Sequence, residues 1–130
     1  MISKINHIGV VVKDLEESSE MFQKCTGLPL IRTEDLPDWN CRMAFFQCGE
    51  VMIELVQPTG EGGSMTFLRE KGGGINHICF QVEDVYETFD LMKDKYILKS
   101  DSPRIAAGGS KAFFIDEKCT DNIRIEFMSE

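Results

Sequence analysis

The two histidines of this chain, His7 and His77, stand in identical four-residue contexts, Ile-Asn-His-Ile, that lie 70 residues apart. Two glutamates also have matching contexts: Glu54 lies in Ile-Glu-Leu and Glu126 in Ile-Glu-Phe, 72 residues further on. Two neutral imidazoles and two carboxylates form a mixed nitrogen and oxygen ligand set, which suits a divalent Ni, Co, Zn, Mn or Fe ion. An octahedral ion with four such ligands keeps two open positions, where it can polarise a carbonyl group as a Lewis acid.

The matching contexts belong to a longer internal repeat. Val12-Lys13-Asp14-Leu15 corresponds to Val82-Glu83-Asp84-Val85, and Ala44-Phe45-Phe46 corresponds to Ala112-Phe113-Phe114, at nearly the same offset. Anchors in the same order with nearly constant offsets predict two copies of one structural module. A single buried histidine usually serves the core, and a single strand glutamate is usually solvated. Because both residue types occur at equivalent positions of both copies, the repeat favours a metal site.

The predicted elements that position these residues repeat with the motif. In the first copy, alternation predicts a strand over residues 5–12, with His7 facing away from the apolar face of that strand. Asp14, followed by Glu17, is typical of a capping box and predicts a helix start there. The remaining predicted segments are a strand from Leu30-Ile31, a polar loop over 34–40, and strands over 42–48 and 50–56.

The second copy follows a boundary rich in glycine and proline. A short helix is predicted over about 64–71, then a strand over 75–82 and a helix from Asp84 with its own capping-box glutamate, Glu87. The closing strands are predicted over 97–100, 111–116 and 122–128. The fold class predicted for residues 1–130 is α+β, with two tandem βαβββ modules (about 1–58 and 75–130, linker and short helix 59–74) that form a curved mixed sheet around a central metal site.

Strand parity indicates where the four candidate ligands point. Side chains alternate between the two faces of a strand, so Glu54 opposes Ile53 and Leu55, and Glu126 opposes its two apolar neighbours in the same way. We expect the apolar faces to pack against the module helices. If the two modules form one curved sheet, all four candidate ligands converge on its concave side.

Composition excludes several classes of function. The 130 residues are 42% hydrophobic and 28% charged, as in an ordinary compact domain, and the net charge of −8 argues against nucleic acid and anionic membranes as partners. No apolar run approaches the roughly 20 residues of a membrane helix, and the first residues are too short an apolar stretch for a signal peptide. Five cysteines without a C-x-x-C pair predict reduced thiols in a cytoplasmic protein.

The whole pattern resembles the vicinal-oxygen-chelate superfamily, which comprises glyoxalases, bleomycin-resistance proteins and dioxygenases, and within it the methylmalonyl-CoA epimerases. The stretches that carry this resemblance are His7-Ile8-Gly9-Val10-Val11-Val12-Lys13-Asp14-Leu15, Ile53-Glu54-Leu55-Val56-Gln57-Pro58, Phe67-Leu68-Arg69-Glu70-Lys71-Gly72, Asn76-His77-Ile78 and the Gly108-Gly109 loop before Ala112-Phe113-Phe114. They span essentially the whole chain, which is then one domain of this superfamily.

The resemblance implies a metal-dependent isomerase or lyase that moves a proton next to a carbonyl through an enediolate. It implies His7, Glu54, His77 and Glu126 as ligands of one divalent metal ion, and Glu126 as the catalytic proton shuttle. It also implies a homodimer and an acyl-CoA substrate. Lys111 and Arg42 are the candidate substrate-binding residues.

The chain departs from the epimerase pattern at one catalytic position. Some epimerases carry a second catalytic glutamate on the strand that is Arg42-Met43-Ala44 here, and Met43 lies near that place. Epimerisation requires a base on each face of the intermediate. Glu126 can be one of them, and the sequence does not identify the other.

Two alternative functions remain. Glyoxalase I (lactoylglutathione lyase) has a similar ligand set and acts on a glutathione adduct, although the 23-residue spacing from Glu54 to His77 looks more like the epimerases. A non-catalytic small-molecule binding protein of the antibiotic-resistance type shares the fold but commonly loses the metal ligands. An extradiol dioxygenase normally lacks a carboxylate at the position of Glu54.

Overall fold

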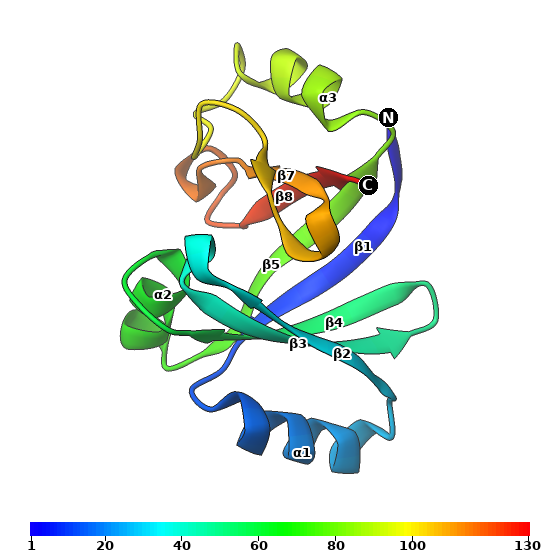
Figure 1. The fold of residues 1–130 in the computed structure, drawn as a ribbon. Helices are drawn as coiled ribbons and strands as arrows, with labels where there is room; N and C mark the ends of the chain where they lie inside the picture. Colours follow the sequence, from blue (N-terminus) through cyan, green and yellow to red (C-terminus); the bar gives the residue numbers. More distant parts are fainter. The chain divides into compact units, whose positions relative to one another are not determined.

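The computed structural model describes residues 1–130, which form two compact units, one of His7–Asn76 and one of Met1–Asn6 with His77–Glu130. The elements in chain order (Figure 1) are β1 (Ile2–Val11), α1 (Leu15–Thr26), β2 (Leu30–Leu36), β3 (Cys41–Cys48), β4 (Val51–Pro58), α2 (Gly63–Lys71), β5 (Gly74–Val82), α3 (Val85–Met92), β6 (Arg104–Ile105), β7 (Lys111–Phe114) and β8 (Ile125–Ser129). Strands β1 and β5 each run from one unit into the other. None of the helices has the length and apolar character that crossing a membrane requires.

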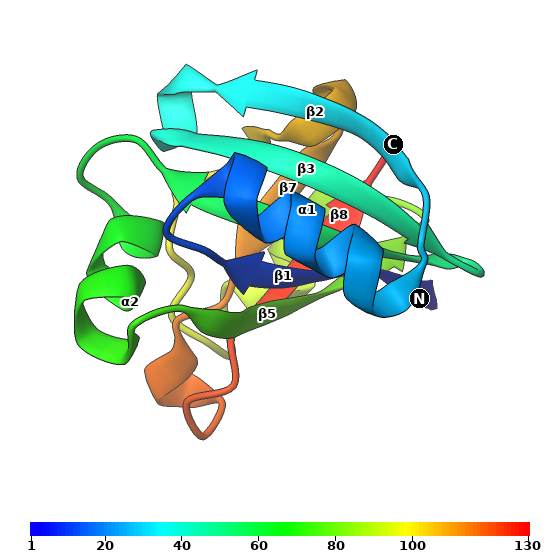
Figure 2. The ribbon, with the colours of Figure 1, turned by 90° about the horizontal axis from the view of Figure 1, so that it is seen from below.

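The first unit, His7–Asn76, is a mixed sheet with a helix on one face. Its strands follow the order β2-β3-β4-β1, with β4 parallel to β1 and the other pairs antiparallel. Helix α1 lies across these strands (Figure 2), where Leu15 packs with Ala44, Phe46 and Leu55. The rings of Phe22 and Phe46 lie 5.0 Å apart between helix and sheet.

The second unit, Met1–Asn6 with His77–Glu130, repeats this arrangement. Strand β8 is parallel to β5 and antiparallel to β7, and β6 pairs with β7 at the edge. Helix α3 buries Val85 and Phe89 against Phe113 and Phe127 of the sheet. The predicted α+β fold with two βαβββ modules is therefore confirmed.

Aspartate caps begin both module helices, as predicted. Asp14 Oδ1 accepts a hydrogen bond of 3.0 Å from the backbone N–H of Glu17. Asp84 Oδ1 accepts hydrogen bonds from the backbone N–H groups of Tyr86, at 2.9 Å, and Glu87, at 3.2 Å. Each bond satisfies an N–H group that has no partner inside the helix, so the same local chemistry starts both modules.

The last strand of each module contributes a second cap at an equivalent position. Gln57 Oε1 accepts a hydrogen bond of 2.8 Å from the backbone N–H of Leu15, the first residue of α1. Ser129 Oγ accepts a bond of 3.2 Å from the N–H of Val85, the first residue of α3. The offset between the two caps is that of the candidate ligands Glu54 and Glu126. The repeat therefore extends to the contacts that join each helix to its sheet.

One predicted loop is wrong, because β2 extends to Leu36. Glu34 and Asp35 lie in this strand, where they pair with Met43 and Arg42 of β3. Their charge suggested a solvated loop, but β2 is the edge of the first unit's sheet. Edge strands commonly carry charged residues, which discourage pairing with other chains.

The closing strands of the second module are also shorter than predicted. The predicted strand over 97–100 is a single bridge between Leu98 and Ile115, and the strand that pairs with β7 is β6. Strand β8 begins at Ile125, because Asp121 and Asn122 have φ angles of 54° and 64°. This left-handed backbone forms a turn and cannot continue a strand.

Replacing Gly73 by alanine should destabilise the first unit by about 2 kcal/mol. Gly73 has a φ of 103°, and a Cβ there would lie 2.9 Å from the carbonyl oxygen of Val11, which is backbone. Gly74→Ala is the matched control, since φ is 115° there but a Cβ meets open space. Urea unfolding should give the control a loss of only about 1 kcal/mol. Equal losses would mean that the contact with Val11 contributes nothing.

Candidate metal centre

The first candidate ligand pair lies on neighbouring parallel strands of the first unit. Strand β1 carries His7 and β4 carries Glu54, and the register aligns Gly9, two residues after His7, with Glu54. Both side chains are buried, and His7 Nε2 lies 3.4 Å from Glu54 Oε2. Ile53 and Leu55 alternate with Glu54 and pack in the cluster beneath α1. The sheet therefore directs the predicted pair to the face that the helix does not cover.

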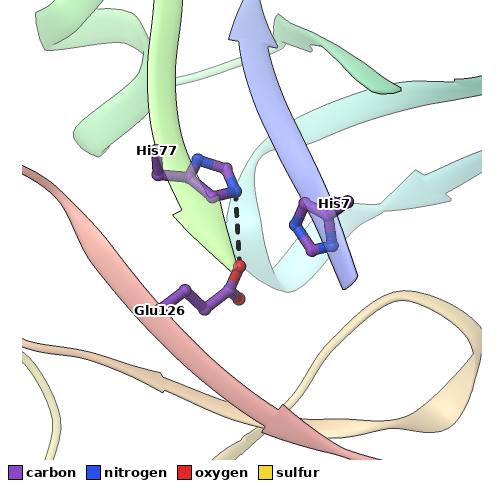
Figure 3. A group of neighbouring side chains, drawn as sticks. All are labelled: His7, His77 and Glu126. Carbon is purple, nitrogen blue, oxygen red and sulfur yellow. Dashed lines mark ion pairs between the residues drawn. The ribbon is translucent and has the colours of Figure 1, made fainter. Parts of the chain in front are cut away.

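The second pair has the same geometry in the second unit. His77 lies on β5 and Glu126 on β8, and the register aligns Cys79, again two residues after the histidine, with Glu126. His77 Nε2 lies 3.3 Å from Glu126 Oε1, the contact that Figure 3 marks with a dashed line. The rings of His77 and Phe114 pack in a T-shaped arrangement, with centroids 5.2 Å apart and planes at 79°. This contact restricts the rotation of the imidazole.

The distances within the two pairs fit ligands of a metal ion. Separations of 3.3 and 3.4 Å are longer than the usual N–H···O distance of about 2.9–3.0 Å. Two donor atoms bound to one ion by bonds of about 2.1 Å, at angles between 90° and 110°, lie roughly 3.0–3.4 Å apart. His7, His77 and Glu126 are all buried, and each can offer one ligand atom. Buried carboxylates are costly unless they are paired or bind a metal.

Arg42, a predicted substrate-binding residue, lies on the other face of the first unit's sheet. Arg42 pairs with Gln57, which lies three residues after Glu54 and therefore points to the opposite face of the sheet. Its guanidinium forms ion pairs with Glu16, at 3.0 Å, and with Asp35, at 3.2 Å. The hydrogen bond to Glu16, and to a smaller degree the one to Asp35, raises the pKa of Arg42. The structure does not bring Arg42 together with the first pair, and its substrate role stays a prediction.

Lys111, the other predicted substrate-binding residue, is half-buried at the start of β7. Its partner on β8 is Ser129, whereas Glu126 is paired with Phe114. By this register Lys111 shares a face with Phe113, which packs against α3, and not with Glu126. Its role in substrate binding also stays a prediction.

Two charged residues that the sequence motifs do not predict as part of a site lie on the face of Glu54. Arg32 and Glu34 lie on β2 and form an ion pair, and the Arg32 guanidinium carbon lies 4.0 Å from the centroid of the Phe45 ring. The register pairs Arg32 with Phe45, and Phe45 in turn with Glu54. The signal that could have revealed them is the i, i+2 spacing of opposite charges after the apolar Leu30-Ile31.

The pKa of the Cys41 thiol is shifted by burial and by the negative charges on this face. Its pKa is raised to about 12, first by burial and then by the negative charges of Glu54 and Glu34. The thiol therefore stays protonated at neutral pH. The charges that act on Cys41 belong to carboxylates from two different strands, β4 and β2.

The chain is similar to curated epimerases over nearly its whole length. It is 32% identical over 130 residues to the ethylmalonyl-CoA/methylmalonyl-CoA epimerase of Cereibacter sphaeroides, covering 97% of both chains. It is 30% identical over 128 residues to the mitochondrial methylmalonyl-CoA epimerase of Mus musculus, covering 96% of this chain and 72% of the mouse protein.

Solved structures and the family profile agree with these similarities. A methylmalonyl-CoA epimerase in complex with methylmalonyl-CoA and NH4+ matches with a TM-score of 0.95 at 25% identity, over 100% of this chain and 96% of that chain. The profile of the glyoxalase/bleomycin resistance protein/dioxygenase superfamily matches residues 6–114. The chain therefore belongs to the glyoxalase/bleomycin resistance protein/dioxygenase superfamily.

Proposed function

We propose that this protein is a metal-dependent epimerase that moves a proton at the carbon next to the thioester carbonyl of methylmalonyl-CoA. The observation that carries the proposal is the presence of two buried His–Glu pairs with the same register and nearly the same separation. The substrate class comes from the relatives, since the epimerases that match nearly the whole chain are described as acting on methylmalonyl-CoA. The two His–Glu pairs and the similarity to epimerases both agree with the sequence motifs.

The proposed metal ligands are His7, Glu54, His77 and Glu126, which together would hold one divalent Ni, Co, Zn, Mn or Fe ion. When bound, such an ion would polarise the thioester carbonyl and stabilise the negative charge of the enolate or enediolate. Each histidine would bind through Nε2, the atom that faces its glutamate. Phe114 would keep the His77 ring in the binding orientation through its edge contact.

Glu126 is the proposed proton shuttle of this reaction. Its carboxylate would accept the proton from the carbon next to the carbonyl, while the electron pair of the broken C–H bond moves onto the thioester oxygen. Its burial would keep bulk water away from the negatively charged intermediate while the proton is moved. The same carboxylate would lie within reach of the metal ion, as its short distance to His77 suggests.

Several further properties belong to the same proposal. The protein would act in the cytoplasm, with its cysteines reduced, and as a homodimer. Its partner would be a small acyl-CoA, or in the glyoxalase I alternative a glutathione adduct. The acidic net charge of −8 favours neither nucleic acid nor an anionic membrane as a further partner.

The test is an assay of the purified protein, reconstituted in turn with Ni, Co, Zn, Mn and Fe(II), on one C2 epimer of methylmalonyl-CoA. We expect the other epimer to form until the two are present in about equal amounts, and no conversion of the methylglyoxal–glutathione adduct. Turnover of the adduct alone would assign the chain to glyoxalase I instead. A folded protein that binds no metal and turns over neither compound would contradict enzymatic proton transfer and favour a binding module.

A further inference from the structure

The face of the first unit's sheet that carries Glu54 extends across β3 onto β2. The register pairs Glu54 with Phe45 and Phe45 with Arg32, and in the next row it pairs Val56 with Met43 and Met43 with Glu34. Paired residues in a sheet point to the same face, so Arg32 and Glu34 lie on the side of the first His–Glu pair. Glu34 is thus a second carboxylate on the face where Glu54 meets His7.

The carboxylate of Glu34 is held in place and is only partly open to solvent. Arg32 Nη1 pairs with its Oε1, and the side chain of Glu34 is 24% exposed. Arg32 is itself fixed by the Phe45 ring beneath it, at 4.0 Å, in a cation–π contact. Met43, directly across from Glu34, is buried and supplies an apolar neighbour. The contribution of Glu34 to the raised pKa of Cys41 shows that its charge acts on this face.

Inversion at a carbon requires two proton-transfer groups. One group removes the proton from one side, and the other delivers a proton to the opposite side. The proposed function provides Glu126 as one group. Glu54 would be engaged as a metal ligand, which leaves Glu34 as the further carboxylate on its face.

We infer that Glu34 is the second proton-transfer group of this site and that Arg32 is its positioning residue. This inference rests on the proposed function and adds the residue for the opposite face. In one direction the ionised Glu34 accepts the proton as the C–H bond breaks, and the electron pair moves to the thioester oxygen. The carboxyl of Glu126, protonated at the start of this direction, then donates its proton to the opposite side, and the electron pair returns to form the new C–H bond. The other direction is the reverse, with Glu126 as the acceptor.

Each turnover in this direction leaves Glu34 protonated and Glu126 ionised. The reverse reaction, which starts from the other epimer, restores the starting state, so the protons balance over the two directions. No oxidant or further reactant is needed.

The experiment compares Glu34→Gln with Glu20→Gln in the metal-loaded protein. Glu20 is the matched control because it is also ion-paired, with Lys24 at 2.8 Å, but lies exposed on α1. We expect Glu34→Gln to slow epimerisation by about 100-fold or more, since a positioned acid or base contributes roughly 10²–10⁴-fold. In D2O this variant should still exchange the α-proton of one epimer, the one served by Glu126, without inverting it. Metal content should equal that of the parent.

Arg32 provides a second variant with a distinct readout. Arg32→Gln should lower kcat by about tenfold and bias exchange towards the same epimer, whereas Arg32→Lys should restore most of the rate by keeping the positive charge. A purely structural role of Arg32 would lower the exchange of both epimers to the same degree.

The outcomes separate this inference from the proposed function. An active parent whose Glu34→Gln variant epimerises at the parent rate would overturn the role of Glu34 and leave the proposed function standing. Equal loss of exchange in both epimers, or loss of metal from Glu34→Gln, would also overturn it. A parent that does not epimerise would overturn the proposed function and the inference with it.

Discussion

Replacing His77 by alanine is expected to reduce the bound divalent metal from about one ion per chain to a small fraction of that amount. The variant loses Nε2, the donor atom 3.3 Å from Glu126. Epimerisation should slow by about 10³-fold, because the Lewis-acid contribution is on the order of several kcal/mol and each 1.4 kcal/mol is about tenfold in rate. The measurement is metal content by mass spectrometry, followed by the epimerase assay.

A control is needed because alanine also removes the packing of His77 against Phe114. His77→Gln keeps most of the side-chain volume and should lose metal to a similar degree. Glu83→Gln, an exposed acidic residue just after β5, should keep both metal and activity. Metal binding by His77→Ala at the level of the parent would contradict the assignment of His77 as a ligand.

Local patterns in the sequence predict the helix starts and the strand faces on which the candidate ligands lie. The aspartate caps Asp14 and Asp84 begin the module helices because their side chains satisfy the first backbone N–H groups. Strand parity placed Glu54 and Glu126 opposite the helix-packed faces, because the side-chain period of a strand is two. The repeat predicted that each module carries one histidine and one glutamate of the candidate set.

Residues whose role depends on a distant partner were not predictable in this way. The positive charge of Arg42 suggests substrate binding, but its guanidinium forms ion pairs with Glu16 of α1 and Asp35 of β2. Glu34 lies in a polar stretch that by itself predicts a loop, and only its pairing with β3 makes that stretch a strand. Cross-strand register is set by contacts that single-sequence periodicity does not contain.

Replacing Phe113 by alanine should lower the free energy of unfolding by about 3–5 kcal/mol, the usual cost of removing a buried phenylalanine. Phe113 is 1% exposed, and its ring centroid lies 5.1 Å from that of Phe89 on α3 and 5.4 Å from that of Phe127 on β8. Urea unfolding measures the loss. Phe113→Leu, which leaves a smaller void, should cost less, about 1–2 kcal/mol. A loss below about 1 kcal/mol for the alanine variant would mean that the second unit does not depend on this cluster.

Phe113→Ala also distinguishes the roles of the two faces of β8. Phe127 faces α3, and its neighbour Glu126 faces His77, so one side of the strand stabilises the fold and the other would bind the metal. Metal at about 100 times its dissociation constant should add roughly 2.7 kcal/mol to the stability of any folded variant that keeps the site. Phe113→Ala should gain this increment, although it starts from a lower stability, whereas His77→Ala should gain little. An equal increment in His77→Ala would mean that the stabilising ion binds elsewhere, and the His77–Glu126 pair would then be a contact of the fold alone.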